Sequence, residues 1–500
     1  MSNPNPATTP APRWFCWFAA VALLGYGVFL GKYFTPAAGG SDSSGYLNAA
    51  RLIASGHLTA PLRAVPGPAD YAGVHVQPLG FLVELERGRI VPTYPLGLPA
   101  HFAVVSRLVG WTAGPLLVGV GAALAALWLC YLVARELGLS WPLAAVGALT
   151  LGAFPVTLFI ALQPLSDVLA TTWCLAAMLA ALRAQRTLRW AFICGAALAV
   201  AVFVRPTNVL LLPALVVFLG HWRRIAAAAL GGLPGALALA WCNRHLYGSP
   251  WRMGYGSVFE AFDSAYFQPT MLHFAHWLAV MLPAVFLLLP FAVFARGQAR
   301  GRGRILIALA LWFSVPVMFY AYYEVSHEVW WCLRFILPAV PALIVAALLG
   351  LDALLPRHPR ARPVAAVAVS LWAIAGFWYW TAHFHILNTQ IDEHGYIEVG
   401  GWARDHLPAG SVVACMADSG AIYYYTSFPI VRWDVMSADD FSRHVTAIAR
   451  ARQPLYLIVF PFEETRALGE HPPARWEKTA VVAGRNIWRY LGPATGAPSP

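Results

Sequence analysis

Apolar stretches of membrane-spanning length recur along most of the chain. The first is Trp14–Phe34 and the last is Val364–Trp380, and polar or basic loops separate successive stretches. Because a helix needs roughly 20 apolar residues to cross the hydrocarbon core of a bilayer, we predict a polytopic α-helical membrane protein with about eleven transmembrane helices. The other predicted spans are Pro115–Ala134, Trp141–Leu162, Leu165–Leu182, Trp190–Val204, Val209–Gly220, Ile225–Trp241, Leu272–Phe294, Ile305–Tyr322 and Phe335–Leu355.

The composition excludes a soluble fold. Hydrophobic residues make up 59% of the 500 residues and charged residues only 11%, and the mean hydropathy is +0.60. The formal net charge of +11 comes from arginines in short clusters between apolar stretches. This pattern is typical of cytoplasmic loops, so we interpret the charge as a determinant of orientation and predict no nucleic-acid partner. The 7 cysteines are scattered and indicate neither a disulfide framework nor a zinc site.

The arginine clusters predict the topology. If the N-terminus is cytoplasmic and the two short arms around Arg205 are separate spans, every cluster falls on the cytoplasmic side, as the positive-inside rule requires. Merging those arms into one kinked span would push the later clusters outside. The clusters are Arg135; Arg183, Arg186 and Arg189; Arg223 and Arg224; Arg296, Arg300, Arg302 and Arg304; and Arg357, Arg360 and Arg362. We therefore predict a multi-pass protein of the inner (plasma) membrane whose C-terminal part is extracytoplasmic.

This topology divides the chain into a transmembrane domain, residues 1–380, and an extracytoplasmic domain, residues 381–500. The transmembrane domain includes a long first outer loop, residues 35–114. Apolar residues at helical spacing predict an amphipathic helix in this loop, N-capped by Ser41 or Asp42 and lying on the membrane. Phe81–Glu84 and Arg89–Val91 are predicted to form a hairpin around Gly88.

The C-terminal region has a different pattern, typical of a small α/β domain. A helix is expected at Asp392–His406, and short strands at Ser411–Met416 and Leu455–Phe460. Between the strands, Ser437 followed by Asp440 resembles a capping box at the start of another helix. Mixed helices and strands in a polar segment predict a small α/β domain outside the membrane.

Four charged residues at the outer boundary are the first candidates for function. Asp42 lies a few residues beyond the first span, and ionisable groups held at the hydrocarbon boundary are more often functional than structural. The alternative for Asp42 is a helix cap, and for Asp167 a first-turn carboxylate that interacts with the helix dipole. Arg205 and Arg334 lie on the side where the charge rule disfavours arginine, although each could simply snorkel from a span end.

Further candidates come from two outer loops. His327 and Glu328 lie in a short loop beside two tryptophans, where they could orient a substrate or belong to an interfacial aromatic belt. The spacing of these side chains is not that of a dedicated metal site, so no cofactor is predicted and a divalent metal is not indicated. Tyr46, on the expected amphipathic helix, and Tyr94 complete the set, with helix packing as the alternative for Tyr46.

Several short motifs follow one another along the chain: Asp42 with its helix, Tyr94–Pro99, Gln163–Asp167, Val204–Asn208 and Leu333–Pro341. Their order resembles the glycosyltransferase-C superfamily, in particular bacterial relatives of the protein O-mannosyltransferase and aminoarabinose-transferase group. The resemblance covers essentially the whole chain. Many members carry an Asp-Glu pair in the first loop, whereas here Ser43 follows Asp42.

The resemblance implies a membrane glycosyltransferase that moves a sugar from a polyprenyl-phosphate carrier to a lipid, glycan or protein acceptor of the cell envelope, with inversion. Asp42 would be the general base and Asp167 a second carboxylate in the site, while Arg205 and Arg334 would bind the donor phosphate. Tyr46, Tyr94, His327 and Glu328 would contact the substrates. The alternatives are a transporter or flippase for a lipid-linked or anionic solute and a non-catalytic envelope-assembly protein. Transporters tend to show repeated halves and charges at the bilayer midplane, and neither is evident here.

Overall fold

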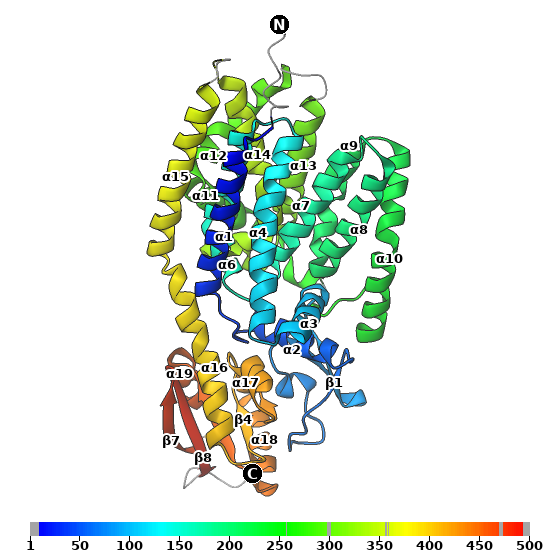
Figure 1. Ribbon diagram of the computed structural model, residues 1–500. Helices are drawn as coiled ribbons and strands as arrows, with labels where there is room; N and C mark the ends of the chain where they lie inside the picture. The colour runs from blue at the N-terminus through cyan, green and yellow to red at the C-terminus, as the bar shows by residue number, and fades with distance from the viewer. Residues whose placement is uncertain are drawn as a thin grey trace.

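The computed structural model describes residues 10–256, 258–297, 302–355, 358, 360–469 and 474–493. Long helices form a bundle, and a smaller sheet domain is attached at one end of it (Figure 1). The first helix begins at the opposite end, and α15 leads from the bundle into the sheet domain through α16. We call these the sheet-domain end and the distal end.

The helices of the bundle follow the apolar stretches of the sequence. Labels with α denote α-helices and labels with η denote 3₁₀ helices. They are α1 (Arg13–Tyr33), α4 (Ala113–Glu136), α5 (Trp141–Ala153), α6 (Pro155–Ala161), α7 (Asp167–Arg183), α8 (Leu188–Val204), η3 (Pro206–Leu211), α9 (Leu212–Leu219), α10 (Trp222–Tyr247), α11 (Phe267–Met281), α12 (Pro283–Leu288), α13 (Arg302–Tyr320), η8 (Trp330–Ala339), α14 (Val340–Leu354) and α15 (Ala361–His383).

Six helical segments within the described residues are long and apolar enough to cross a membrane, and eight if each of two bent pairs counts as one span. The bends are 60° between α5 and α6 and 101° between α11 and the helix that follows it. Prolines at the start of α6 and α12 explain both bends, because proline removes a backbone donor and clashes with the preceding turn. The many-span helical class is confirmed, whereas the number of eleven stays a prediction.

The two arms around Arg205 are separate helices that run back and forth through the bundle. Arg224, at the start of α10, donates a hydrogen bond to Gln185, just before α8. Arg205, between the two arms, contacts the first residue of α7 at the other end of the bundle. A single kinked span could not bring these contacts to opposite ends, so the structure agrees with the sequence-based choice.

The described arginine clusters gather at the distal end. Arg183 and Arg186 both pair with Glu136, at 2.8 and 2.7 Å. Arg304 donates to the Val217 and Phe218 carbonyls at the end of α9. The clustering on one end matches the expectation from the charge pattern. Arg300 and Arg357 lie outside the described residues.

The first loop contains the predicted hairpin. β2 (Phe81–Glu84) and β3 (Arg89–Pro92) pair antiparallel, and Gly88 adopts the left-handed φ of +56° that the tight turn needs. A short β1 (Ala60–Pro61) adds a third strand in the order β1-β3-β2. The loop then returns to the bundle through α3 (Gly97–Val109).

The expected helix of the first loop is α2 (Asp42–Ala54). Residues 43–50 are all buried, because α2 lies between α3 and the sheet domain. Ser41 is the N-cap residue, yet its side chain makes no capping hydrogen bond, and Asp42 is the first helical residue. The helix is therefore more extensively packed than an amphipathic helix on a surface, and its place on the membrane stays a prediction.

The sheet domain is built from a mixed sheet. Strand order is β5-β4-β6-β8-β7, with β5, β4 and β6 parallel and β8 and β7 antiparallel. The serine half of the predicted capping box is present, since the Ser437 hydroxyl accepts a hydrogen bond from the Asp440 amide at 3.1 Å, and the hydroxyl donates to the Asp440 carboxylate at 2.7 Å. The elements are α16 (Thr389–His406), β4 (Val412–Ala414), α17 (Ser419–Tyr425), β5 (Ile430–Val431), α18 (Ala438–Arg450), β6 (Leu455–Val459), α19 (Pro461–Gly469), β7 (Ala474–Val482) and β8 (Arg485–Pro493).

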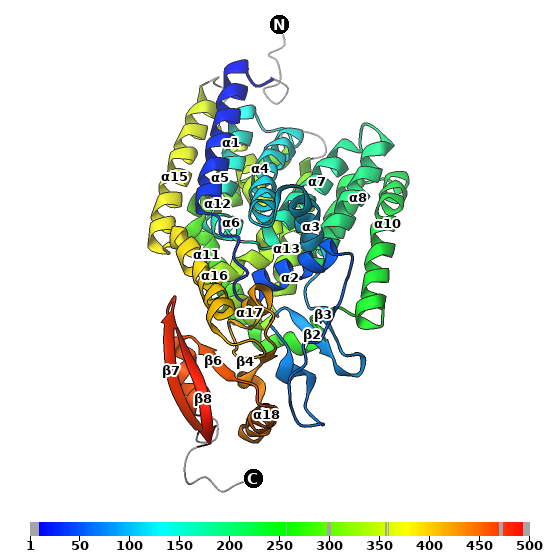
Figure 2. The same ribbon diagram turned by 60° about the horizontal axis from the view of Figure 1, so that its bottom comes forward.

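The sheet domain holds α2 in place (Figure 2). Asn48 donates to the Gly420 carbonyl at 3.1 Å, and Arg51 donates to the Tyr424 carbonyl at 2.8 Å. Gly420 contacts Ser44 so closely that a Cβ atom at position 420 would clash with the serine hydroxyl. Because α2 carries Asp42, the domain fixes the position of that carboxylate.

Candidate functional site

Asp42 forms an ion pair with Arg334. The Nη2 atom of Arg334 lies 2.7 Å from the Oδ2 atom of Asp42, and the exposed fractions of the two side chains are 15% and 26%. Arg334 comes from η8, and its Nε atom is buried without a hydrogen-bond partner in the described structure. An arginine with a free buried donor beside a partly exposed carboxylate retains capacity to bind an anion.

Asp167 and Arg205 form a second, more deeply buried ion pair. Asp167 begins α7 and Arg205 follows α8, and the exposed fractions of their side chains are 2% and 15%. The Nη1 atom of Arg205 donates to the Oδ1 atom of Asp167. The dipole interpretation of Asp167 is compatible with its place in the first turn, but its carboxylate also has a specific cationic partner.

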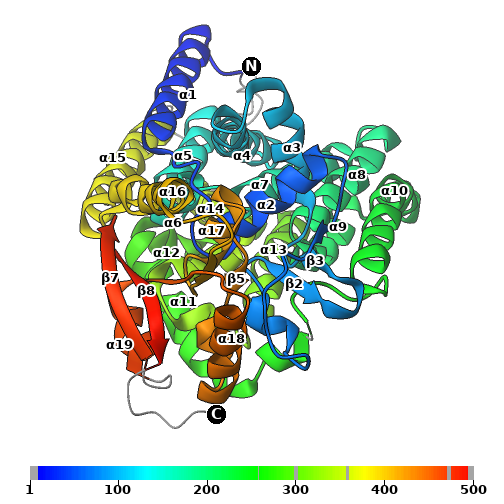
Figure 3. The ribbon, with the colours of Figure 1, turned by 90° about the horizontal axis from the view of Figure 1, so that it is seen from below.

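The two ion pairs converge on one aromatic ring. The guanidinium of Arg205 lies 5.8 Å from the centre of the Phe335 ring, and that of Arg334 lies 5.3 Å from the same ring. Arg334 also lies 5.2 Å from the Trp331 ring. Such positions over ring faces are favourable for a guanidinium. Seen from the sheet-domain end, α2 crosses the bundle near its centre (Figure 3).

Two tyrosines from the predicted set line the same region. The Tyr94 hydroxyl lies 2.7 Å from the Ser41 hydroxyl and also hydrogen-bonds Asp42. The Tyr46 hydroxyl lies 2.9 Å from the Ser166 hydroxyl, next to Asp167, and the two tyrosine rings are 5.1 Å apart. The packed rings of the two tyrosines therefore lie between the Asp42 pair and Ser166, the residue before Asp167.

Sequence reasoning missed Tyr255, which comes from the loop after α10. Its ring lies 5.8 Å from Tyr94, and it interacts electrostatically with Asp42 and Arg205. Gly254 makes the approach of this loop possible, because a Cβ there would clash with the Thr93 carbonyl. A Gly-Tyr step in an outer loop carries no distinctive signal, so only the tertiary contact reveals this residue.

The electrostatic surroundings favour ionised Asp42. Burial alone would raise the pKa of its carboxyl, but the charge of Arg334 and hydrogen bonds from Tyr94 and Arg334 outweigh burial, and Arg205 adds to their effect. The pKa of Asp42 is therefore lowered from its ordinary value. A carboxylate held in this way accepts a proton readily only after Arg334 has found another anion.

His327 and Glu328 lie apart from the two ion pairs. The His327 Nδ1 atom is 3.3 Å from the Thr270 hydroxyl, and its ring packs 5.9 Å from Tyr266, so it faces α11. Glu328 is exposed. Among the described residues, no hydrogen bond or ion pair joins either side chain to Asp42, Asp167 or their arginines, and a substrate role for them stays a prediction.

The described residues contain no group of three or more His, Cys, Asp or Glu side chains arranged to hold a metal ion. The two carboxylates of the site each have an arginine partner instead. In chemical terms, the two arginines can bind an anion, and a carboxylate can accept a proton.

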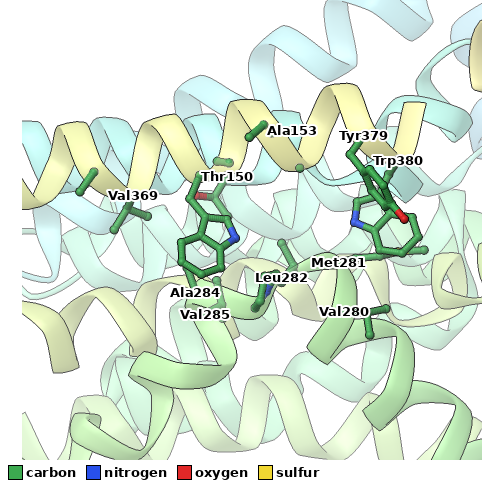
Figure 4. Close-up of a pocket in the computed structure, with 16 residues that line it drawn as sticks. Thr150, Ala153, Val280, Met281, Leu282, Ala284, Val285, Val369, Tyr379 and Trp380 are labelled. Carbon is green, nitrogen blue, oxygen red and sulfur yellow. The ribbon is translucent and has the colours of Figure 1, made fainter. Parts of the chain in front are cut away.

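An apolar cavity of about 570 Å³ lies between α5, the α11–α12 bend and α15. Thr150, Val285 and Val369 line one end of it, and Tyr379 and Trp380 line the other end (Figure 4). Trp380 stacks on Phe384 at 5.2 Å, and Phe384 stacks on Trp330 at 4.2 Å. These rings connect the cavity to the helix that carries Arg334.

Comparison with known sequences identifies no relative: no protein-family model matches the chain, and no curated protein matches it. Solved structures do match. ArnT from Cupriavidus metallidurans bound to undecaprenyl phosphate aligns with a TM-score of 0.62 at 15% identity, covering 96% of this chain and 98% of that one. The resemblance inferred from the motifs is therefore supported by a solved structure of nearly equal length.

Two further glycosyltransferases share the fold. The arabinofuranosyltransferase AftD from Mycobacteria aligns with a TM-score of 0.57 at 14% identity, over 97% of this chain and 40% of that one. The oligosaccharyltransferase AglB from Archaeoglobus fulgidus, solved with an inhibitory peptide and a dolichol-phosphate, gives 0.56 at 11% identity, over 97% and 75%. The chain thus has the fold of these solved structures, in agreement with the fold that the resemblance of its motifs implied.

Proposed function

We propose that this chain is a membrane glycosyltransferase that transfers a sugar from a polyprenyl-phosphate carrier to a cell-envelope acceptor, with inversion at the sugar. The observation that carries the proposal is the convergence of two largely buried arginines, Arg205 and Arg334, beside the carboxylate of Asp42. The shared fold supports it, since ArnT was solved with undecaprenyl phosphate and AglB with a dolichol-phosphate.

The proposed chemistry needs one base and two cations. Phosphate is already a good leaving group, so no acid has to protonate it, unlike the glycosidic oxygen in sugar hydrolysis. The acceptor hydroxyl attacks the anomeric carbon as Asp42 takes its proton, and the bond from that carbon to the phosphate oxygen breaks. Arg205 and Arg334 stabilise the charge that the departing phosphate gains.

The ion pairs also suggest how the donor prepares the base. In the structure, Arg334 binds Asp42. The donor phosphate on Arg334 would take over that cation, because a phosphodiester carries a negative charge and two free oxygens that accept hydrogen bonds from a guanidinium. Asp42 would then lose the interaction that lowers its pKa and become a stronger base.

The lipid part of the donor needs an apolar environment. The cavity beside α15 is lined almost entirely by hydrocarbon and aromatic groups and is connected by stacked rings to η8, which carries Arg334. It supports a lipid substrate, whether the prenyl chain of the donor or a chain of a lipid acceptor.

We further propose the orientation and location that the charge pattern predicts. The arginine-rich distal end would be cytoplasmic, and the sheet domain, residues 381–500, extracytoplasmic. The two ion pairs would then face the outside of the inner membrane, where nucleotide sugars are absent and a lipid carrier must deliver the sugar. Labelling of cysteines placed at His358 and Arg404, which are both exposed, checks this in intact cells, since labelling of both from the same side would contradict the proposal.

The test compares wild type with Asp42→Asn. Purified protein in liposomes is supplied with undecaprenyl-phosphate sugars and an envelope extract, and released undecaprenyl phosphate is measured by mass spectrometry. Loss of a general base typically lowers a rate about 100- to 10,000-fold, so release by Asp42→Asn should fall by that amount. Binding of undecaprenyl phosphate should persist or tighten, because the variant removes the carboxylate that competes for Arg334.

Asp405→Asn is the matched control, because Asp405 is an exposed aspartate of the sheet domain with a side-chain exposure of 57%. It should release undecaprenyl phosphate at the wild-type rate. Full activity of Asp42→Asn would remove Asp42 from the catalytic residues. Wild-type protein that binds undecaprenyl phosphate and moves it across the bilayer without releasing it from a sugar would favour the transporter instead.

A further inference from the structure

Two buried histidines meet where the first outer loop packs against the sheet domain. His75 lies in η1 (Gly73–Val76) of the loop, and His444 lies on α18 of the domain. The Nδ1 atom of His75 is 3.3 Å from the Nε2 atom of His444, and the exposed fractions of the two residues are 6% and 0%. In Figure 3 the loop runs beside α18. We call this contact the histidine pair.

The histidine pair is enclosed by both segments. A Cβ at Gly67 of the loop would lie 2.7 Å from the Cε1 atom of His444. Val65 and Val76 of the loop belong to the same buried apolar cluster as Phe441 of α18. A charge on either imidazole ring is therefore removed from water, and burial disfavours the charged form.

The two facing nitrogens can share one proton but not two. In a hydrogen bond between two imidazoles, one nitrogen donates and the other accepts. When both rings are protonated, every ring nitrogen is a donor, so two N–H groups and two positive charges face each other across the contact between His75 and His444. The contact is compatible with neutral rings or with one charge, and it is incompatible with two.

The surrounding carboxylates do not compensate a second positive charge. Arg443 forms ion pairs with Asp70 at 3.0 Å and with Asp440 at 2.5 Å, so both carboxylates already have a cation. Burial lowers the pKa of both histidines, Arg443 acts in the same direction and Asp440 opposes it. The pKa of His444 is lowered further by His75. The charged and titratable groups around the pair are Asp70 and Tyr71 of the loop, Asp440 and Arg443 of α18, and Arg432 and Asp434 after β5.

The loop continues from the histidine pair to α2, the helix that carries the proposed base. The Leu79 amide donates a hydrogen bond to the Ser419 hydroxyl of the sheet domain at 3.1 Å. Gly80 follows, and it lies so close to α2 that a Cβ at this position would be 2.4 Å from the Gly45 Cα atom. Since only a few residues separate Gly80 from His75, release of the histidine pair would loosen a segment that packs on α2.

We propose that the histidine pair is a pH-sensitive contact, which holds the first loop on the sheet domain near neutral pH and opens in acid when both rings become charged. This property goes beyond the proposed transfer reaction and does not depend on it. Because burial lowers both pKa values, the released loop binds protons more readily than the docked loop. The free energy of docking is therefore fully present above the ordinary histidine pKa of about 6.5 and is lost as the pH falls below it.

The experiment measures hydrogen–deuterium exchange of the purified full chain by mass spectrometry, at about pH 7.5 and about pH 5, above and below the ordinary pKa of histidine. Rates are corrected for the intrinsic effect of pH on exchange. Peptides covering residues 66–80 should exchange several-fold faster in acid, whereas peptides covering β6 should change little. Exchange is measured locally because the raised pKa of Asp418 gives the whole domain a pH dependence of the opposite sign.

Two variants keep a hydrogen bond at the contact but remove one of the titrating rings. In His444→Gln the new amide replaces the Nε2 atom, and in His75→Asn it replaces the Nδ1 atom, so each amide can accept a hydrogen bond from the charged histidine that remains. Both variants should lose the acid-induced increase over residues 66–80. His394→Gln is the matched control, because His394 is a histidine of the sheet domain with a side-chain exposure of 56%, and it should behave as wild type.

Equal corrected exchange of wild-type residues 66–80 at the two pH values would overturn the proposal. An increase of wild-type size in both His444→Gln and His75→Asn would also overturn it, because another group would then control the loop. The same holds if β6 exchanges faster in acid by the same factor as the loop, since the whole domain would then be loosened. A Tm measured at neutral pH shows whether each variant is folded, and either variant alone is sufficient for the comparison.

Discussion

Arginines lie at both ends of the helical bundle, but their ion-pair partners and their exposure differ between the two ends. At the distal end, Arg183 and Arg186 share Glu136, and Arg186 is 64% exposed. At the sheet-domain end, Arg205 and Arg334 are each 15% exposed and have separate carboxylates. Charges that water reaches need no dedicated partner, whereas charges removed from water do. The difference is the one expected if, as proposed, the distal arginines orient the chain and the other two serve a site.

The largest effect on stability is expected from Asp167→Ala. The change leaves the guanidinium of Arg205 buried without its counter-charge, which typically costs about 3–5 kcal/mol. Thermal unfolding in detergent should show a correspondingly lower Tm. The double variant Asp167→Leu with Arg205→Met should recover most of the loss, because removing both charges is often close to neutral. Equal stability of Asp167→Ala and wild type would show that this ion pair contributes as little to stability as the exposed pairs at the distal end.

Arg334→Ala should affect activity more than stability. It removes one of the two cations proposed to stabilise the departing phosphate, a loss of about 2–4 kcal/mol in the transition state. Release of undecaprenyl phosphate should fall about 30- to 1,000-fold, and Arg334→Lys should restore part of it, since lysine keeps the charge but not the planar fork. Arg186→Ala is the control. If both alanine variants lose activity equally, the distinction between the two ends fails.

Asp418 is a third kind of carboxylate, buried but with a poor partner. The Arg485 Nε atom lies 3.5 Å from its Oδ1 atom, beyond a good hydrogen bond. Burial raises the pKa of Asp418 to about 7, with Glu463 adding to the effect and Arg485 opposing it. Folded Asp418 thus stays protonated up to about pH 7, while in the unfolded chain it ionises near its ordinary pKa of about 3.9.

Stability should therefore fall as the pH rises from about 4 to 7, and the loss is complete above that. We expect the sheet domain to be about 2 kcal/mol more stable at pH 5.5 than at pH 8. Burial also raises the pKa of Glu393, on α16, to about 7, which gives a dependence of the same sign. Asp418→Asn should therefore reduce the dependence without abolishing it and raise the Tm at pH 8, whereas Asp405→Asn should leave both unchanged. Asp42 has the opposite sign, because its lowered pKa adds stability that is lost only below about pH 4. A Tm that rises from pH 5.5 to 8 would contradict the assignment.

The smallest effect is expected at the distal end. Arg186→Ala should change the free energy of unfolding by about 0–1 kcal/mol, because an exposed ion pair gains little in water. The difference from wild type should shrink further at 0.5 M salt, where screening is stronger. If Arg186→Ala lowers the free energy of unfolding as much as Asp167→Ala does, the exposure of an ion pair does not determine its contribution to stability, and the distinction between the two ends fails.

Local sequence predicted several parts of the structure. The Gly88 hairpin and the Ser437 cap depend on contacts within a few residues, and both were found as predicted. The longest strands, β7 and β8, were missed, although Ala483-Gly484 between two runs rich in β-branched and aromatic residues is a hairpin signal. Tyr255 was missed because its significance depends on Tyr94, far away in the chain.

By itself, the sequence determined that the chain is a many-span membrane protein, which end of the bundle collects the arginine clusters, and which charged residues lie at the other end. The length of an apolar stretch and the charge of a loop are properties of contiguous residues, so both can be recognised in the sequence without a structure. Only the tertiary structure decided that Arg334 binds Asp42 and Arg205 binds Asp167, and that α2 is buried between α3 and the sheet domain. These features join residues 38 to 372 positions apart, and their geometry depends on how helices and domain pack against one another.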